Sequence, residues 1–309
     1  MSARPGRDSV PNVTPDLPGL HWRATIALLR RLPQAALSRA FGRIADVPVP
    51  RRLRRSVLGT FARALGIDIS EAELPLEEYE SVNALFVRRL RPGVRSWPRD
   101  AATIAAPAEG IMGHHGAILD GRLMQAKGRT YTAAALLDSD AEAASFDGGS
   151  FITIYLSPRH YHRIHAPCGG TIPLARHIPG ALLPVNEPSV RHVPDLFPRN
   201  ERVICSIDGP LGRAAVVAVG AYNVGRISTA FDEDWAGPRG SVANRGAAAV
   251  ETRRYDPPRA VQQGDEIMAF HLGSTIVALF QPGPRLAVPP PGSEVRLGQV
   301  LLRAAPRIV

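Results

Sequence analysis

The most informative stretch of this chain is Glu266-Ile267-Met268-Ala269-Phe270-His271-Leu272-Gly273-Ser274-Thr275-Ile276-Val277-Ala278-Leu279-Phe280. It places an apolar run on each side of a Gly-Ser pair. Such runs, rich in β-branched residues and broken by glycine, are typical of strands that meet at a tight turn, where glycine adopts dihedrals that a side chain disfavours. The stretch therefore predicts two strands, 266–270 and 276–280, joined through Gly273 and Ser274.

The same pattern of short apolar runs continues through most of the chain, from about Trp97 onward. Further short apolar runs, broken by glycine and proline, cover 103–106, 116–119, 151–156, 202–207 and 214–221. Short strands with this spacing are typical of antiparallel or barrel-like sheets. The sequence predicts an α+β, mainly β fold in which residues 97–309 form a β-rich domain.

The N-terminal part has a different character. Residues 1–19 are proline-rich and polar, which predicts a disordered tail without a secretory signal. Residues 20–96 are expected to be helical, with apolar stripes at Trp22, Ile26 and Leu29 and at Leu53, Val57, Phe61 and Leu65. Two interpretations of the stripes stay open: helices packed on their own domain, and helices lying in a lipid headgroup layer.

The charge distribution bears on that choice. The chain carries 37 Lys+Arg against 28 Asp+Glu, and Lys127 is its only lysine. Between residues 23 and 55, where Asp46 is the only acid, nine arginines cluster: Arg23, Arg30, Arg31, Arg39, Arg43, Arg51, Arg52, Arg54 and Arg55. A basic amphipathic helix is attracted to anionic lipid.

Two further observations concern the compartment. The longest apolar runs, such as 214–219, fall far short of the ~20 residues that a spanning helix needs, so no transmembrane helix is expected. Cys168 and Cys205 are far apart and lack paired metal spacing, which favours reduced thiols in a cytosol.

Three segments carry candidate chemistry. A hydroxyl such as that of Ser274 can attack the preceding carbonyl, here that of Gly273, which turns an amide into an ester. Residues 155–168 gather His160, His162 and His165 after a proline-terminated strand, and histidine transfers protons near neutral pH. Glu109 stands between a proline and a glycine. Acid, histidine and serine together are the parts of a base-activated nucleophile, although a plain turn and packing histidines would give the same residues.

Taken together, these segments resemble the phosphatidylserine decarboxylase family, whose proenzymes cut themselves to form a pyruvoyl group. Over about 20–282 the chain can be read against the family pattern, in segments that include Phe86-Val87-Arg88-Arg89-Leu90-Arg91-Pro92, Pro184-Val185-Asn186 and Asn200-Glu201-Arg202-Val203-Ile204-Cys205. The resemblance implies a barrel-sandwich-like catalytic domain over 97–309, preceded by membrane-associating amphipathic helices within 20–96.

The resemblance also implies roles for single residues. Ser274 cleaves the chain after Gly273 and becomes the pyruvoyl group; His165 activates Ser274; Glu109 orients His165; His162 lies near the substrate during decarboxylation. The pyruvoyl group forms a Schiff base with phosphatidylserine, and loss of CO2 gives phosphatidylethanolamine. No metal is implied. The family usually has Asp at the position of Glu109 and an acid at that of His160; a shift of about an ångström can cost a catalytic site roughly a hundredfold.

The implied partners follow from this chemistry. They are phosphatidylserine and an anionic membrane surface, with the protein peripheral on the cytoplasmic face of the cell membrane and the cleaved chains 1–273 and 274–309 staying associated. No nucleic acid is expected. The resemblance leaves a homodimer open.

Two rival functions remain in view. His160-x-His162-x-x-His165 has the residue type of a zinc hydrolase site, but Ile164 stands where a carboxylate would be useful. A non-catalytic carrier or lipid-binding module of the barrel-sandwich type is the other rival; a carrier needs a modifiable lysine, and Lys127 lacks the usual flanking residues. The same single lysine argues against a pyridoxal phosphate enzyme.

Overall fold

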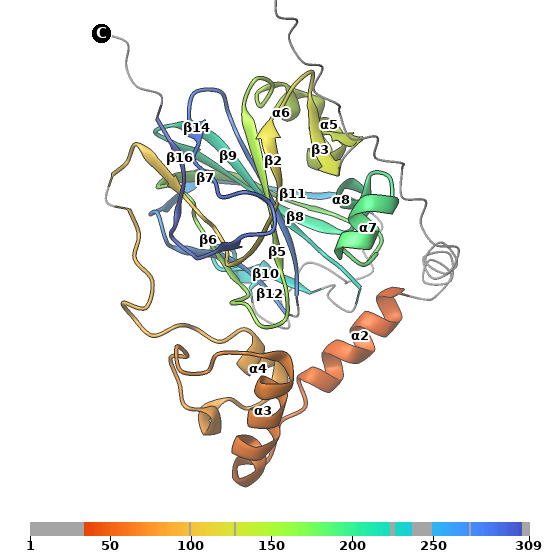
Figure 1. Cartoon of the computed structure of the whole chain (residues 1–309), viewed down its shortest axis with the longest axis vertical. Coiled ribbons are helices and arrows are strands. Elements are labelled where there is room, and N and C mark those ends of the chain that lie inside the picture. The colour runs from red at the N-terminus through yellow and green to blue at the C-terminus, as the bar shows by residue number, and fades with distance from the viewer. Residues whose placement is uncertain are drawn as a thin grey trace, which may run out of the picture. The chain divides into compact units, whose positions relative to one another are not determined.

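A computed structural model of the chain describes residues 34–98, 100–126, 128–222, 226–236, 249–271 and 273–304. The chain divides into two compact units, Met1–Leu32 and Pro33–Val309, and every described residue belongs to the second (Figure 1). The expected tail 1–19 and the stripe of Trp22, Ile26 and Leu29 lie outside the described residues.

An eight-stranded antiparallel sheet forms the centre of this unit. Its strand order is β11-β7-β8-β9-β13-β5-β2-β15, with β2 (Gly110–Ala117), β5 (Ser150–Leu156), β7 (Gly170–Ile178), β8 (Arg202–Gly209), β9 (Gly212–Val219), β11 (Glu251–Val261), β13 (Ser274–Phe280) and β15 (Glu294–Val295). Strand β13 pairs with β9 on one side and β5 on the other. All of its residues are buried, which explains why its sequence is a continuous apolar run rather than an alternating one.

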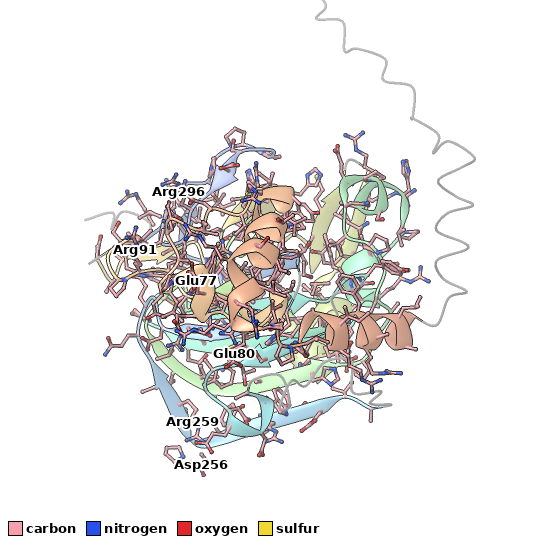
Figure 2. All side chains as sticks on the ribbon, turned by 90° about the horizontal axis from the view of Figure 1, so that it is seen from below. Glu77, Glu80, Arg91, Asp256, Arg259 and Arg296 are labelled. Atoms are coloured by element: carbon pink, nitrogen blue, oxygen red, sulfur yellow. The ribbon has the colours of Figure 1, made fainter. Side chains whose placement is uncertain are left out.

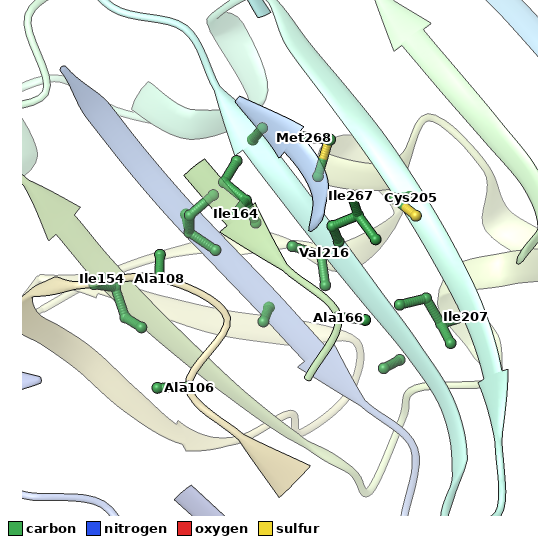
Figure 3. Packing of buried hydrophobic residues seen from close by; sticks show 14 of the residues in the cluster. Ala106, Ala108, Ile154, Ile164, Ala166, Cys205, Ile207, Val216, Ile267 and Met268 are labelled. Carbon is green, nitrogen blue, oxygen red and sulfur yellow. The ribbon is translucent and has the colours of Figure 1, made fainter. Parts of the chain in front are cut away.

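Two three-stranded sheets cover one face of the large sheet. One has the order β1 (Thr103–Ala105), β16 (Val300–Arg303), β14 (Arg285–Leu286); the other has β10 (Ile227–Thr229), β12 (Glu266–Phe270), β6 (Arg163–His165). A single buried cluster joins Ile154 and Val216 of the large sheet to Ile164 and Met268 of the β10-β12-β6 sheet (Figure 3). The mainly β prediction is confirmed, and the two layers pack as a sandwich.

Short helices and a hairpin complete the β-rich part: α5 (Ala133–Leu137), α6 (Asp140–Ala144), α7 (Glu187–His192), α8 (Leu196–Arg199) and the β3 (Arg122–Ala126)–β4 (Arg129–Thr132) pair. Side-chain caps begin α5, α6 and α7, at Thr132, Ser139 and Asn186. Buried Arg202 of β8 donates to the carbonyls of Ala135 and Leu136. The guanidinium thus ties α5 to the large sheet.

The helices before the sheets are α2 (Gln34–Ala45), α3 (Arg51–Leu65), η1 (Leu76–Glu78) and α4 (Val82–Phe86). Gly66 ends α3 in the left-handed conformation, with φ 68°. Leu58 and Ala62 are the side chains that α3 buries, whereas Leu53 and Val57 stay exposed. The expected stripe therefore lies only partly against the protein.

Strands and turns differ from the sequence predictions in three respects. Residues 116–119 were expected to form a strand, but β2 begins earlier, at Gly110, and ends at Ala117. Several strands were not anticipated: β3, β4, β6, β7, β10, β11, β14, β15 and β16. The strands on either side of Gly273 do not pair with each other, because β12 belongs to a small sheet and β13 to the large one. The Gly-Ser pair therefore lies where the chain crosses between sheets.

A buried polar network connects the helices to this crossing. Asp46, just after α2, pairs with Arg226 at 2.5 Å. His271, at the end of β12, contacts the Asn83 amide of α4 at 3.2 Å and the Ser228 hydroxyl of β10 at 3.0 Å. Burial, together with the positive charge of Arg226, lowers the pKa of His271 to about 3.

This shift makes stability depend on pH. Because the folded pKa of His271 lies below the ordinary value near 6.5, the unfolded chain takes up the proton first, so the stabilisation is complete above pH 6.5 and is lost as the pH falls toward 3. The loss between pH 6.5 and 5 is about 2 kcal/mol for this residue. In urea unfolding at several pH values, His271→Gln should flatten the decline by about this amount. An unchanged slope would contradict the assignment.

Candidate active site

Gly273 and Ser274 occupy a confined position at the start of β13. Ser274 pairs with Leu156 of β5, and its buried Oγ makes no hydrogen bond with any described residue. A Cβ added at Gly273 would lie 2.9 Å from the carbonyl oxygen of Leu156 and 3.3 Å from Nε2 of His162. The first of these contacts is too close for any real side chain, so glycine is the residue that fits before Ser274.

His162 is the histidine that borders Gly273. It has no exposed surface, and its ring packs against that of Phe86 with 4.0 Å between centroids. Neither ring nitrogen makes a hydrogen bond of ordinary geometry with a described residue. Burial, and next the positive charge of Arg88, lowers the pKa of His162 well below its usual range. The imidazole is therefore neutral at pH 7, and the backbone of His160 and Leu156 lies close to it.

His165 is held differently, at the end of β6. Its Nδ1 lies 2.7 Å from the Gly264 carbonyl oxygen, and its Nε2 lies 3.2 Å from the Tyr161 hydroxyl. A carbonyl only accepts, so Nδ1 carries the hydrogen and Nε2 is the acceptor. Burial lowers the pKa of His165. This tautomer gives His165 a basic nitrogen, as a proton acceptor requires.

Glu109 contacts a different set of groups from the one expected. Its buried carboxylate pairs with Arg95 and accepts the Leu297 N–H at 3.3 Å. Arg95 also binds Glu71 at 2.6 Å. No hydrogen bond joins Glu109 to His165, whose orientation comes from the Gly264 carbonyl. The role of Glu109 in orienting the base stays a prediction.

The three histidines do not gather around a common point. His160 Nδ1 contacts the Ser157 N–H and hydroxyl, each at 3.0 Å, while His165 faces Gly264 and Tyr161. Across the described ranges, no three His, Cys, Asp or Glu side chains are placed to hold a metal ion. Lys127, on which the carrier interpretation depends, lies outside the described residues.

A cavity of about 520 Å³ adjoins Thr275, the residue after Ser274. Its lining includes Thr153 and Tyr155 of β5, Thr275 of β13 and Val190 of α7. The hydroxyls of Thr153 and Thr275 are buried and without a described partner. Sequence reasoning missed these two threonines, since nothing in the local sequence shows that their side chains share one face of the sheet.

The site combines a buried serine hydroxyl without a described partner, a preceding glycine whose place no side chain could take, and a neutral histidine. The family model described as phosphatidylserine decarboxylase matches residues 82–303. The chain therefore belongs to the phosphatidylserine decarboxylase family.

Curated relatives agree over nearly the whole length. A protein of Anaeromyxobacter sp. (strain K) is 44% identical over 288 residues, which cover 92% of this chain and 99% of the relative. One from Acidovorax ebreus (strain TPSY) is 43% identical over 280 residues, covering 87% and 94%, and one from Bordetella avium (strain 197N) is 42% identical over 256 residues, covering 81% and 84%. All three are named phosphatidylserine decarboxylase proenzyme.

Proposed function

We propose that this chain is the proenzyme of a phosphatidylserine decarboxylase that cuts itself between Gly273 and Ser274. The observation that carries the proposal is the position of this bond, at the start of a central strand, with the Ser274 hydroxyl unpartnered and His162 beside Gly273. The family supplies the substrate, phosphatidylserine, and the product, phosphatidylethanolamine.

Within this proposal, each residue has a stated task. Ser274 is the nucleophile, His165 accepts its proton through Nε2, and Glu109 is the acid nearby that the family pattern assigns to orienting the base. His162 stays next to residue 274 and moves a proton on the substrate during decarboxylation.

A pyruvoyl group fits the residues present. The unpartnered Oγ of Ser274 and the neutral imidazole of His162 are groups that such a conversion and its chemistry would use. A pyruvoyl carbonyl supplies an electron-accepting centre for the carbanion that loss of CO2 creates.

Intact mass spectrometry tests the proposal directly. The purified protein should give two masses, one for residues 1–273 and one for residues 274–309 lacking the mass of one ammonia. A single mass for the whole chain would refute self-cleavage at this bond. Two masses without the loss of ammonia would refute the pyruvoyl group.

Association with a membrane surface is the second part of the proposal. Phe41 and Ile44 of α2 are 45% and 69% exposed, and Leu53 and Val57 of α3 are similarly open. The same helices carry arginines: Arg39 and Arg43 on α2, and Arg51, Arg52, Arg54, Arg55 and Arg63 on α3. Exposed apolar side chains beside arginines favour an anionic headgroup layer, here the cytoplasmic face of the cell membrane. In the described part of the chain, no helix has the length and apolarity to cross a membrane.

Substitution on α2 tests this association. Replacing Phe41 and Ile44 by Asp should weaken binding to anionic vesicles at least about tenfold, because two apolar side chains no longer leave water. Activity on detergent-dispersed substrate should be retained. The matched control replaces Leu119 and Met124, which are 64% and 47% exposed elsewhere on the protein. Equal losses in cosedimentation for both pairs would contradict a membrane role for α2.

A further inference from the structure

Arg88 is a buried guanidinium without a partner. It follows α4 closely and is 4% exposed. Its Nε and Nη1 are shielded from solvent and make no hydrogen bond within the described part of the chain. Burial lowers the pKa of Arg88, yet a guanidinium keeps its charge at physiological pH. A buried charge is strongly unfavourable unless an opposite charge offsets it.

The acids that act on Arg88 are engaged elsewhere. Glu109 pairs with Arg95 and accepts the Leu297 N–H. Asp68 accepts the N–H of Ser70 at 2.8 Å and its hydroxyl at 2.7 Å. The other groups that act on Arg88 are the phenols Tyr79 and Tyr161, and burial raises the pKa of both. None of these groups makes a hydrogen bond with Nε or Nη1 of Arg88.

Gly273 and Phe86 both contact His162, and the charge of Arg88, two residues after Phe86, acts on the same imidazole. Phe86, two residues before Arg88, packs on the His162 ring, and the carbonyl of Val87 accepts from Arg163 Nε at 2.8 Å. Of the charges that act on His162, that of Arg88 has the largest effect, and His160 follows. On the other side, His162 Nε2 is 3.3 Å from the position of a Cβ on Gly273.

We propose that Arg88 is the counter-ion of the carboxylate that self-cleavage creates at Gly273. The inference rests on the proposed self-cleavage and assigns to Arg88 a role in holding the cleaved state. In the precursor, Nε and Nη1 of Arg88 have no acceptor among the described residues; in the cut protein they gain one. Cleavage then converts an unfavourable buried charge into a buried ion pair, which stabilises the product of the reaction and opposes its reversal.

The atoms balance without an outside oxidant or reductant. The Ser274 oxygen attacks the Gly273 carbonyl carbon, the C–N bond breaks, and an ester forms with release of the amine. A base then removes the Ser274 α-proton, the Cβ–Oγ bond breaks, and Gly273 leaves as a carboxylate. Water replaces the nitrogen of the remaining residue, which departs as ammonia.

Thermal unfolding in two backgrounds tests the proposal. In the cut enzyme, Arg88→Gln should lower the Tm, on the order of 5 °C, because it leaves the new carboxylate unpaired. In the uncut Ser274→Ala chain, the same change should leave the Tm unchanged or raise it, because it removes an unpaired buried charge. Both measurements exclude lipid, so no head-group anion can serve as the partner.

The control is Arg89→Gln. The Arg89 side chain is 62% exposed and lies 3.6 Å from Glu266, and this change should shift the Tm little and equally in both backgrounds. Equal losses for Arg88→Gln in the two backgrounds would overturn the proposal, since Arg88 would then support the fold before cleavage. A loss in neither background would also overturn it.

A second measurement needs no Arg88 variant and covers the case in which Arg88→Gln does not mature. Of the 28 glycines, Gly273 is the one that cleavage converts to a carboxylate, so carbonyl-labelled glycine marks it by NMR. Its signal should not move between pH 7 and 4. An ordinary α-carboxyl, with a pKa of about 3.5, would begin to titrate there and would overturn the pair. Absence of any carboxylate signal would instead refute self-cleavage itself.

Discussion

Replacing Ser274 by alanine should leave the chain at full length and abolish decarboxylation. The methyl group of alanine fits the buried position at the start of β13, but it cannot attack the Gly273 carbonyl, so neither the ester nor the pyruvoyl group forms. The expected loss is complete rather than partial, because the same residue supplies both reactions. Gel analysis of the chain and release of labelled CO2 measure the two effects.

The matched control for this experiment is Ser157→Ala. Ser157 follows Leu156, the residue that pairs with Ser274, and its hydroxyl contacts His160 rather than Gly273. This variant should mature and decarboxylate at a rate close to that of the unchanged protein. A two-chain product from Ser274→Ala would show that another residue cuts the chain.

His162→Asn should reduce decarboxylation by roughly 10²- to 10⁴-fold, the usual contribution of a general acid or base. The physical reason is the neutral imidazole that borders residue 273; asparagine keeps a polar group there but exchanges no proton. The rate is expressed per cleaved chain, so that slow maturation is not mistaken for slow chemistry.

The neighbouring His160 supplies the control. It sits on the same turn, but its Nδ1 is occupied by Ser157. His160→Asn should therefore change the rate per cleaved chain by no more than a few fold. If His162→Asn decarboxylates within twofold of the unchanged enzyme, His162 has no part in the chemistry.

The elements that the sequence predicted well are those with a strong local signal. Strand β13 was recognisable because seven consecutive buried residues leave an unbroken apolar run. Strand β11 was not, because it is mostly exposed, charged and interrupted by prolines. Asp256 and Arg259 of β11 are labelled in Figure 2. Its strand conformation comes from pairing with β7, which local propensity does not reveal.

The candidate site, like the fold, combines features that the local sequence reveals with features that only tertiary contacts create. The positions of Gly273, Ser274 and His162 could be predicted, since motif residues and family resemblance mark them. The partners of Glu109 and His165 could not. Arg95 and Gly264 are drawn from distant segments, and only the folded chain brings a guanidinium to Glu109 or a backbone carbonyl to the Nδ1 of His165. The isolation of Arg88 is likewise a property of its tertiary surroundings.

The placement of β13 between β9 and β5 sets an order of events. The chain after Ser274 supplies a central strand of the large sheet, its edge strand β15, and two strands of a small sheet. The proposed cut before β13 would leave a two-chain protein whose smaller chain contributes strands to both layers. The smaller chain could dissociate only if the core unfolded, and it could not easily rebind to a larger chain that had already folded. Self-cleavage must therefore follow folding. A destabilised mutant would be expected to accumulate as the uncleaved precursor.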